Sequence, residues 1–115
     1  MKICLICFWI GDKPWYFDYF KHSLEYYNNM DLLIVTNSDT FESSKNIAVV
    51  KKPLQLINKQ ISEKLKIEYT LPNTRKLCDL KPAYGAICED HIKQYDYWGF
   101  CDLDVIWGNI DHYTT

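Results

Sequence analysis

The sequence predicts an α/β fold with a mostly parallel central sheet flanked by helices. Short apolar runs rich in β-branched residues, typical of buried strands, alternate with segments whose apolar residues recur at helical spacing. The 115 residues match the usual size of one domain, and 48% hydrophobic and 24% charged residues are typical of a chain that folds around a core. We therefore expect residues 1–115 to form a single domain built from parallel βαβ units.

The first strand is expected over residues 3–10, an apolar run that stops at the turn sequence Gly-Asp-Lys-Pro, residues 11–14. In the helix that follows, Asp12 is a suitable cap and Pro14 a suitable first-turn residue. The apolar side chains recur at helical spacing, at Phe17, Phe20, Leu24 and Tyr27. This pattern predicts an amphipathic helix that packs on the sheet.

A second strand is expected over 32–36, before the polar cluster 37–40, and a third over 46–50. Residues Leu54, Ile57, Ile61 and Leu65 then predict a second amphipathic helix. Between 66 and 78 no period is visible, so we expect a loop there.

A third helix is expected to open at Asp79, with Pro82 in its first turn. Its inward side is predicted to carry Leu80, Tyr84, Ile87, His91 and Tyr95. Gly85 lies inside this helix at a cost of about 1 kcal/mol relative to alanine. Both a tolerated defect and a close approach by another backbone or a ligand stay open as explanations. The last strand is expected to be a central one, over 97–105.

The five cysteines are expected to be reduced, buried thiols, because they lie in apolar, strand-like surroundings: Cys4, Cys7, Cys78, Cys88 and Cys101. Cys4 and Cys7 form a C-x-x-C, but they lie inside a predicted strand and not at a helix N-terminus. We therefore predict no redox or zinc function for them.

Charge and hydropathy exclude two classes of partner. The net charge is −2 with acidic and basic residues mixed along the chain, so the sequence lacks the basic surface that nucleic-acid binding requires. No apolar stretch is long enough for a transmembrane segment.

The residues predicted to bind a metal ion are Asp102 and Asp104. Side chains two apart on a strand point to the same side, which turns Leu103 into the core. Mg²⁺ and Mn²⁺ favour oxygen ligands and are often shared between one or two carboxylates and a substrate's phosphates. From the residues alone, two carboxylates that only solvate a loop remain an equal alternative.

Two segments, 76–85 and 95–109, resemble a family of bacterial GT-A glycosyltransferases associated with capsular and surface polysaccharide genes. The resemblance extends to residues 8–11, 14–17 and 32–37 and so covers most of the chain. It implies that the fold is the Rossmann-like, nucleotide-sugar-binding half of a GT-A enzyme.

The resemblance also implies roles for individual residues. Asp102 and Asp104 would hold Mn²⁺ or Mg²⁺ and the donor's diphosphate as the catalytic pair, with Leu103 also in the nucleotide site. Base and ribose would be surrounded by Phe8, Trp9, Ile10 and Asn37, and the sugar or its phosphate would face Lys81. For Trp9 a core position, and for Lys81 a solvated surface position, remain alternatives.

The reaction implied is transfer of a sugar from a nucleoside-diphosphate donor to a hydroxyl of a glycan acceptor, with the metal as Lewis acid. Enzymes of this kind continue past the Asp-x-Asp, so we expect this chain to be truncated after it. Self-association or a completing partner chain would then cover exposed apolar surface. The expected location is the cytoplasm, including the inner face of the membrane.

Two other functions are weighed. Phe100 to Val105 also resembles the Asp-x-Asp of haloacid-dehalogenase-like phosphatases, but that motif normally opens its fold, whereas here three predicted strands precede it. The other alternative is a nucleotide-sugar-binding fragment without catalysis, which the short chain favours.

Overall fold

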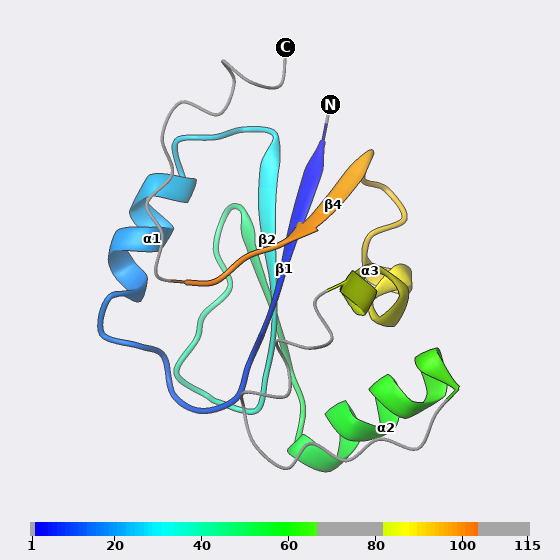
Figure 1. Ribbon diagram of the computed structural model, residues 1–115. Helices are drawn as coiled ribbons and strands as arrows, with labels where there is room; N and C mark the ends of the chain where they lie inside the picture. The colour runs from blue at the N-terminus through cyan, green and yellow to red at the C-terminus, as the bar shows by residue number, and fades with distance from the viewer. Residues whose placement is uncertain (1, 67–81, 104–115) are drawn as a thin grey trace.

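The protein is described by a computed structural model over residues 2–66 and 82–103. Its centre is a four-stranded, all-parallel sheet in the order β3-β2-β1-β4 (Figure 1). The strands are β1 (Ile3–Trp9), β2 (Met30–Thr36), β3 (Ile47–Lys51) and β4 (Tyr97–Phe100). The helices are α1 (Phe17–Leu24), α2 (Leu54–Leu65), α3 (Tyr84–Ile87) and the 3₁₀ turn η2 (Glu89–His91).

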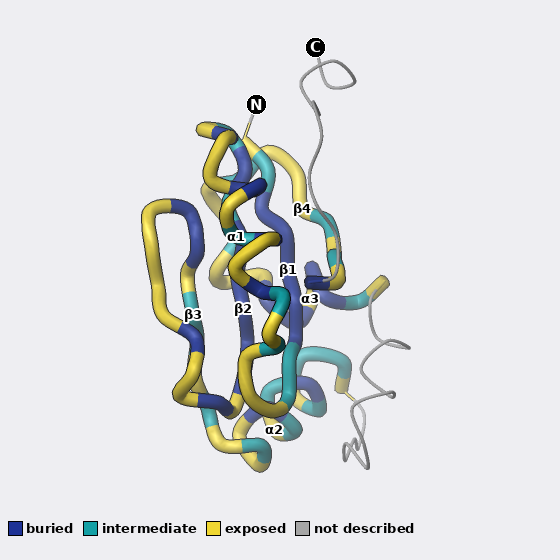
Figure 2. Tube along the Cα trace, turned by 90° about the vertical axis from the view of Figure 1, so that its left-hand side faces the viewer, coloured by how far each residue is buried: buried dark blue, intermediate teal, exposed yellow. Residues whose placement is uncertain are grey.

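Helices cover both faces of the sheet, which confirms the predicted α/β fold with a mostly parallel central sheet. One apolar cluster lies between the sheet and α1, and the other between the sheet and the pair α2 and α3 (Figure 1). β1 and β2 run through the middle and are the most continuously buried segments (Figure 2). A parallel sheet covered on both faces explains why their sequences are almost uniformly apolar.

Alternation along β1 separates the two apolar clusters. Cys4, Ile6 and Phe8 face α2 and α3, whereas Leu5 and Cys7 face α1. Cys4 and Cys7 therefore point to opposite faces and cannot form a redox pair or bind one metal ion. The four described cysteines are reduced thiols, and Cys4, Cys7 and Cys88 are buried as predicted, whereas Cys101 is half-buried; Cys78 lies outside the described residues.

The first two predicted helices are confirmed, including the side that each buries. The buried positions are Phe17, Phe20, Leu24 and Tyr27 in and just after α1, and Ile57 and Ile61 in α2. The predicted cap at Asp12 is wrong, because α1 begins only at Phe17 and has no side-chain cap. The Asp12 carboxylate accepts a hydrogen bond from Ser38 instead.

The third predicted helix is much shorter than expected. α3 ends at Ile87, since Cys88 leaves the helical region with φ −104° and ψ 21°, and η2 follows. The tighter 3₁₀ winding rotates the next side chains away from the α-helical face, so His91 is exposed and not turned inward. Tyr84 and Ile87 are buried as predicted, and Asp79 and Leu80 lie outside the described residues.

Gly85 is explained by a side chain rather than by a backbone or a ligand. A methyl group added at Gly85 would overlap the indole ring of Trp98, a residue of β4 whose side chain packs against α3. Another group does therefore approach the helix closely at this glycine, and that group is the tryptophan side chain of the neighbouring strand.

The last strand ends earlier than predicted. β4 stops at Phe100 and not at residue 105, although the Cys101 amide still donates to the Ile6 carbonyl at 3.3 Å. Among the four described strands β4 lies at the edge and not in the centre. Within the described ranges, no helix has the length and apolar character needed to cross a membrane.

Candidate functional site

The strand order creates a switch point between β1 and β4. From β1 the chain builds β2 and β3 on one side, and β4 then joins β1 on the other side. In open parallel sheets, ligands bind beyond the carboxyl ends of the strands at the point where the order reverses. We call this end of the sheet the carboxyl edge, and its switch point is where a ligand is expected.

The pairing of β1 is asymmetric at this edge. With β4 the register covers Ile3–Ile6, whereas with β2 it continues to the pair of Trp9 and Thr36. The chain leaves β4 at Phe100, beside Ile6, and Asp102 follows before β1 has ended. Asp102 thus follows β4 at the switch point, two residues after the last β4 residue that pairs with β1.

A glycine turn ties β1 to β2 at the carboxyl edge. Gly11 has φ 109°, a conformation that side-chain-bearing residues rarely adopt, and its amide donates to Asn37 Oδ1 at 2.9 Å. Asn37 follows β2 directly and is exposed. The Asn37 side chain accepts this bond through its oxygen, and its amide nitrogen is the donor of the same side chain.

A hydrogen-bond network holds the loops after β1 and β2 together. Ser38 Oγ donates to Asp12 Oδ1 at 2.9 Å and lies 2.7 Å from Thr40 Oγ1. The Lys13 amide donates to the same Thr40 oxygen at 2.6 Å. We call Asp12, Lys13, Ser38 and Thr40 the loop network. It fixes one wall of the carboxyl edge before any ligand arrives.

The three predicted nucleotide contacts at the end of β1 and just after it differ in exposure. Phe8 is buried and packs on Tyr84, with ring centroids 4.7 Å apart. Trp9 is half-buried on the α1 side, where its indole N–H donates to the Asp12 carbonyl at 3.0 Å. Ile10 is half-buried on the opposite side. Trp9 and Ile10 therefore offer surface to a ligand, whereas the Phe8 side chain belongs to the core.

Of the predicted Asp-x-Asp, the structure describes the first two residues. Asp102 is exposed and Leu103 is buried against the α1-side cluster, as predicted, although both follow the end of β4 and are not part of a strand. Leu103 anchors the segment, so that the preceding carboxylate is held at the surface. Asp104 and Lys81 lie outside the described residues.

The chemistry of Asp102 fits a divalent cation. An exposed carboxylate supplies the hard oxygen that Mg²⁺ and Mn²⁺ prefer, and Mg²⁺ commonly uses one or two carboxylates together with substrate phosphates. In residues 2–66 and 82–103, no three potential metal ligands gather in one place.

Sequence reasoning missed the cations near this edge. Lys13 belongs to the loop network, with its ammonium 4.0 Å from the Asp18 carboxylate, and Lys51 and Lys52 come at the end of β3. Lys51 pairs with Asp39, and Lys52 donates to Gln60 Oε1 at 2.9 Å. Their positions at or shortly after strand ends were the available signal, because such residues lie at the carboxyl edge of a parallel sheet.

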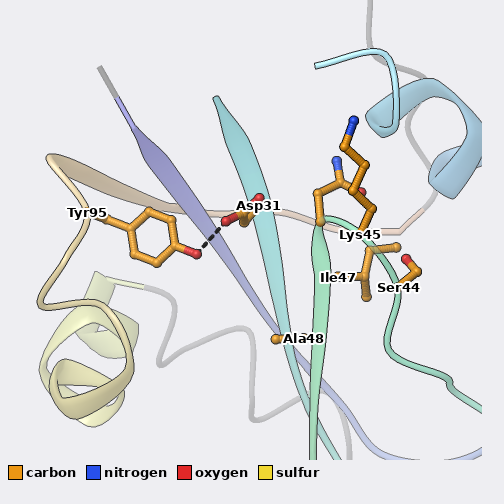
Figure 3. A pocket seen from close by; sticks show the side chains of 7 residues that line it. Asp31, Ser44, Lys45, Ile47, Ala48 and Tyr95 are labelled. Carbon is orange, nitrogen blue, oxygen red and sulfur yellow. Dashed lines mark hydrogen bonds between the residues drawn. The ribbon is translucent and has the colours of Figure 1, made fainter. Parts of the chain in front are cut away.

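A small pocket lies at the opposite, amino edge of the sheet (Figure 3). Its volume is about 90 Å³, and Tyr95 donates to Asp31 Oδ2 beside it at 2.5 Å. Burial, and then the bond to Asp31, raise the pKa of the Tyr95 hydroxyl above its usual range. The buried Asn46 next to it donates to the carbonyls of Leu24 and Met30. These bonds join chain segments at the edge that parallel sheets do not use for ligands, so we assign this pocket a structural role.

Comparison with known proteins gives a family without a described activity. No curated protein and no solved structure matches the chain. A family described as "Family of unknown function (DUF6625)" matches residues 5–115. Since that match covers nearly the whole sequence, the chain belongs to the DUF6625 family.

Proposed function

We propose that this chain is the nucleotide-sugar-binding part of a metal-dependent glycosyltransferase of the GT-A type. The observation that carries the proposal is the position of Asp102, an exposed carboxylate that follows β4 at the switch point beside β1. A parallel sheet binds ligands at this point, and a carboxylate there is suited to a cation shared with a diphosphate. The resemblance of residues 76–85 and 95–109 to GT-A enzymes supplies the reaction class.

In this proposal, Asp102 and Asp104 hold Mn²⁺ or Mg²⁺ against the donor's diphosphate. The bound cation would stabilise the negative charge that develops on the departing diphosphate. Asn37 Nδ2 and the half-buried Trp9 are proposed to contact the base and ribose, and Lys81 is proposed for the sugar or its phosphate. Lys13 is a further candidate for the phosphates, because its loop is fixed by the network at the same edge.

The proposed partners follow from the reaction class. The donor is a nucleoside-diphosphate sugar and the acceptor a glycan hydroxyl, with the reaction placed at the cytoplasmic face of the membrane in surface polysaccharide synthesis. Binding of the donor without turnover, with catalysis completed by a further segment or partner chain, is the second candidate. Exposed Tyr97 and Phe100 on β4 favour it, because such an edge is suited to being covered by more protein.

The test is calorimetric titration of UDP and GDP, each with and without Mn²⁺. We expect metal-dependent binding of one nucleotide to the wild-type chain. Asp102→Asn and Asp104→Asn keep the side-chain shape but remove the charge, and each should weaken binding about tenfold or more. Added donor sugar with an acceptor mixture then separates transfer from binding alone.

The matched control is Glu63→Gln, which removes a carboxylate charge from the exposed side of α2, away from the carboxyl edge. Its nucleotide affinity should stay within about twofold of wild type, because exposed charges this far apart are screened. Nucleotide binding that needs no metal, or that survives both aspartate substitutions, would refute the proposed metal site. Release of phosphate from an aryl phosphate by the wild-type chain would favour the phosphatase instead.

A further inference from the structure

Helix α1 carries a second line of aromatic side chains on its outer face. The inner line is Phe17, Phe20 and Leu24, all buried against the sheet. The outer line, which we call the aromatic stripe, is Trp15, Tyr19, His22 and Tyr26. Tyr19 and His22 lie three positions apart in α1 and are both exposed, and Trp15 and Tyr26 lie in the turns just before and just after the helix. The outer side of α1 faces the viewer in Figure 2.

The rings of the stripe are unusually exposed for their size. The exposed fractions are 84% for Trp15, 64% for Tyr19 and 77% for Tyr26. Large aromatic side chains on a contiguous surface of a monomer mark an interaction site more often than a scattered apolar residue does. Tyrosine and tryptophan also present contact area at low conformational cost, since each has only two side-chain torsions.

The rings also brace one another. Trp15 and Tyr19 meet edge to face, with centroids 6.5 Å apart and planes at 84°. His22 and Tyr26 do the same at 5.7 Å and 77°. Perpendicular pairs hold each ring in place without stacking one ring face on the other, so ring faces remain available for a ligand.

Polar side chains lie beside the aromatic rings and can form hydrogen bonds with a ligand that carries hydroxyl groups. A surface hollow of about 240 Å³ is lined by His22, Glu25 and Tyr26. It combines an aromatic ring with a carboxylate that accepts hydrogen bonds and an imidazole and a phenol that donate or accept them. This pairing suits a sugar ring, which has one face of C–H groups and a rim of hydroxyls.

Two exposed carboxylates beside the stripe disfavour two other ligands of exposed aromatic side chains, nucleic acid and an anionic membrane. Asp18 and Glu25 are exposed next to the rings. A nucleic acid stacked on the rings would bring its phosphates against these carboxylates. An anionic membrane surface would be repelled likewise, and helices that bind such membranes carry Lys or Arg along the polar face.

We propose that the aromatic stripe of α1 binds an oligosaccharide, and that this glycan is the acceptor of the proposed sugar transfer. The second half of this statement rests on the proposed function. The stripe begins at Trp15, directly after the loop network at the carboxyl edge, and runs down α1 towards the amino edge. One end of a chain of sugars that lies along the stripe would thus be at the carboxyl edge, where the site of Asp102 is proposed.

The test is binding to an array of immobilised neutral and acidic oligosaccharides of three or more sugars, without nucleotide or metal. We expect wild-type binding and a loss of affinity of about tenfold or more in the double variant Tyr19→Ser with Tyr26→Ser. Glu25→Gln should weaken binding less, because it keeps an acceptor oxygen. Tyr97→Ser is the matched control: Tyr97 is 62% exposed but lies on β4, off the stripe, and its removal should leave binding within about twofold.

Three outcomes would overturn the inference. They are no binding to any glycan of the array, binding that survives the double variant, and light scattering in which the wild type is a dimer that the double variant converts to a monomer. The nucleotide titrations separate the two proposals. If nucleotide binding fails while the stripe binds glycan, the glycan site stands and its assignment as an acceptor site falls.

Discussion

At the scale of single residues, side chains that look alike in the sequence differ in their burial and hydrogen bonds in the structure. Phe8 and Trp9 are adjacent aromatics at the end of β1, yet Phe8 packs in the core and Trp9 is only partly buried. Asp12 looks like a helix cap but accepts a hydrogen bond from the next loop. Leu103 turns inward and thereby holds Asp102 outward. Each difference follows from which layer the backbone position faces.

Burial of two thiols predicts a loss of stability in alkali. Burial raises the pKa of Cys88 from 9.0 to about 12 and that of Cys4 from 9.0 to about 11. The folded state therefore keeps protons that the unfolded chain releases above pH 9. Stability is unaffected below pH 9 and falls as pH rises towards these values, by roughly 2–3 kcal/mol from Cys88 alone at pH 11.

Urea unfolding at pH 8 to 11 in a reducing buffer measures this effect. Cys88→Ala should flatten the pH dependence, whatever it does to stability at pH 8. Cys101→Ala, in a half-buried position, is the cysteine control. Tyr95, whose pKa is also raised, contributes only above pH 10, and Tyr95→Phe removes that part. An unchanged pH slope in Cys88→Ala would contradict the account.

At the scale of elements, the sequence predicts best what depends on one element alone. The periodic residues of α1 and α2 turn inward as expected, because each helix packs one face on a flat sheet. The glycine of α3 depends on contact with Trp98 from the following strand, which no local pattern encodes. The same holds at the candidate site. Asp102 and Leu103 were predicted from strand alternation, whereas the loop network arises only once β1 and β2 lie side by side.

The contact between α3 and β4 predicts that Gly85→Ala is destabilising. Alanine is the better helix former by about 1 kcal/mol, but its methyl group would overlap the indole of Trp98, and overpacking costs roughly 1–3 kcal/mol. The combination Gly85→Ala with Trp98→Leu should recover part of that loss. Thermal or urea unfolding of the four members of this double-mutant cycle gives the coupling energy.

The control for this cycle is Ala86→Gly at the neighbouring, exposed position of α3. It changes helix propensity without touching Trp98, so it should cost about 1 kcal/mol and show no coupling to Trp98→Leu. A Gly85→Ala variant more stable than wild type would mean that the indole does not lie against α3.

At the scale of the whole molecule, the two edges of the sheet differ in the part of the chain that the structure describes. β3 closes one edge with a short strand whose end carries Lys51, whereas β4 closes the other with exposed aromatics. The alternation of strands and helices predicted the fold class, but not that β4 would join β1 at an edge. That position depends on the path of the chain across the sheet, and the same path creates the switch point at Asp102.

The exposed edge predicts concentration-dependent self-association of this chain. An edge strand with large apolar side chains favours pairing with another strand, and a charge on it opposes such pairing. Light scattering across a concentration series should therefore show wild-type mass rising above that of the monomer, whereas Phe100→Lys should stay monomeric. Tyr19→Ser with Tyr26→Ser alters the other exposed aromatic surface and should associate like wild type. A monomer at every concentration, or association lost in the α1 variant but kept in Phe100→Lys, would show that β4 is not the surface on which copies of this chain meet.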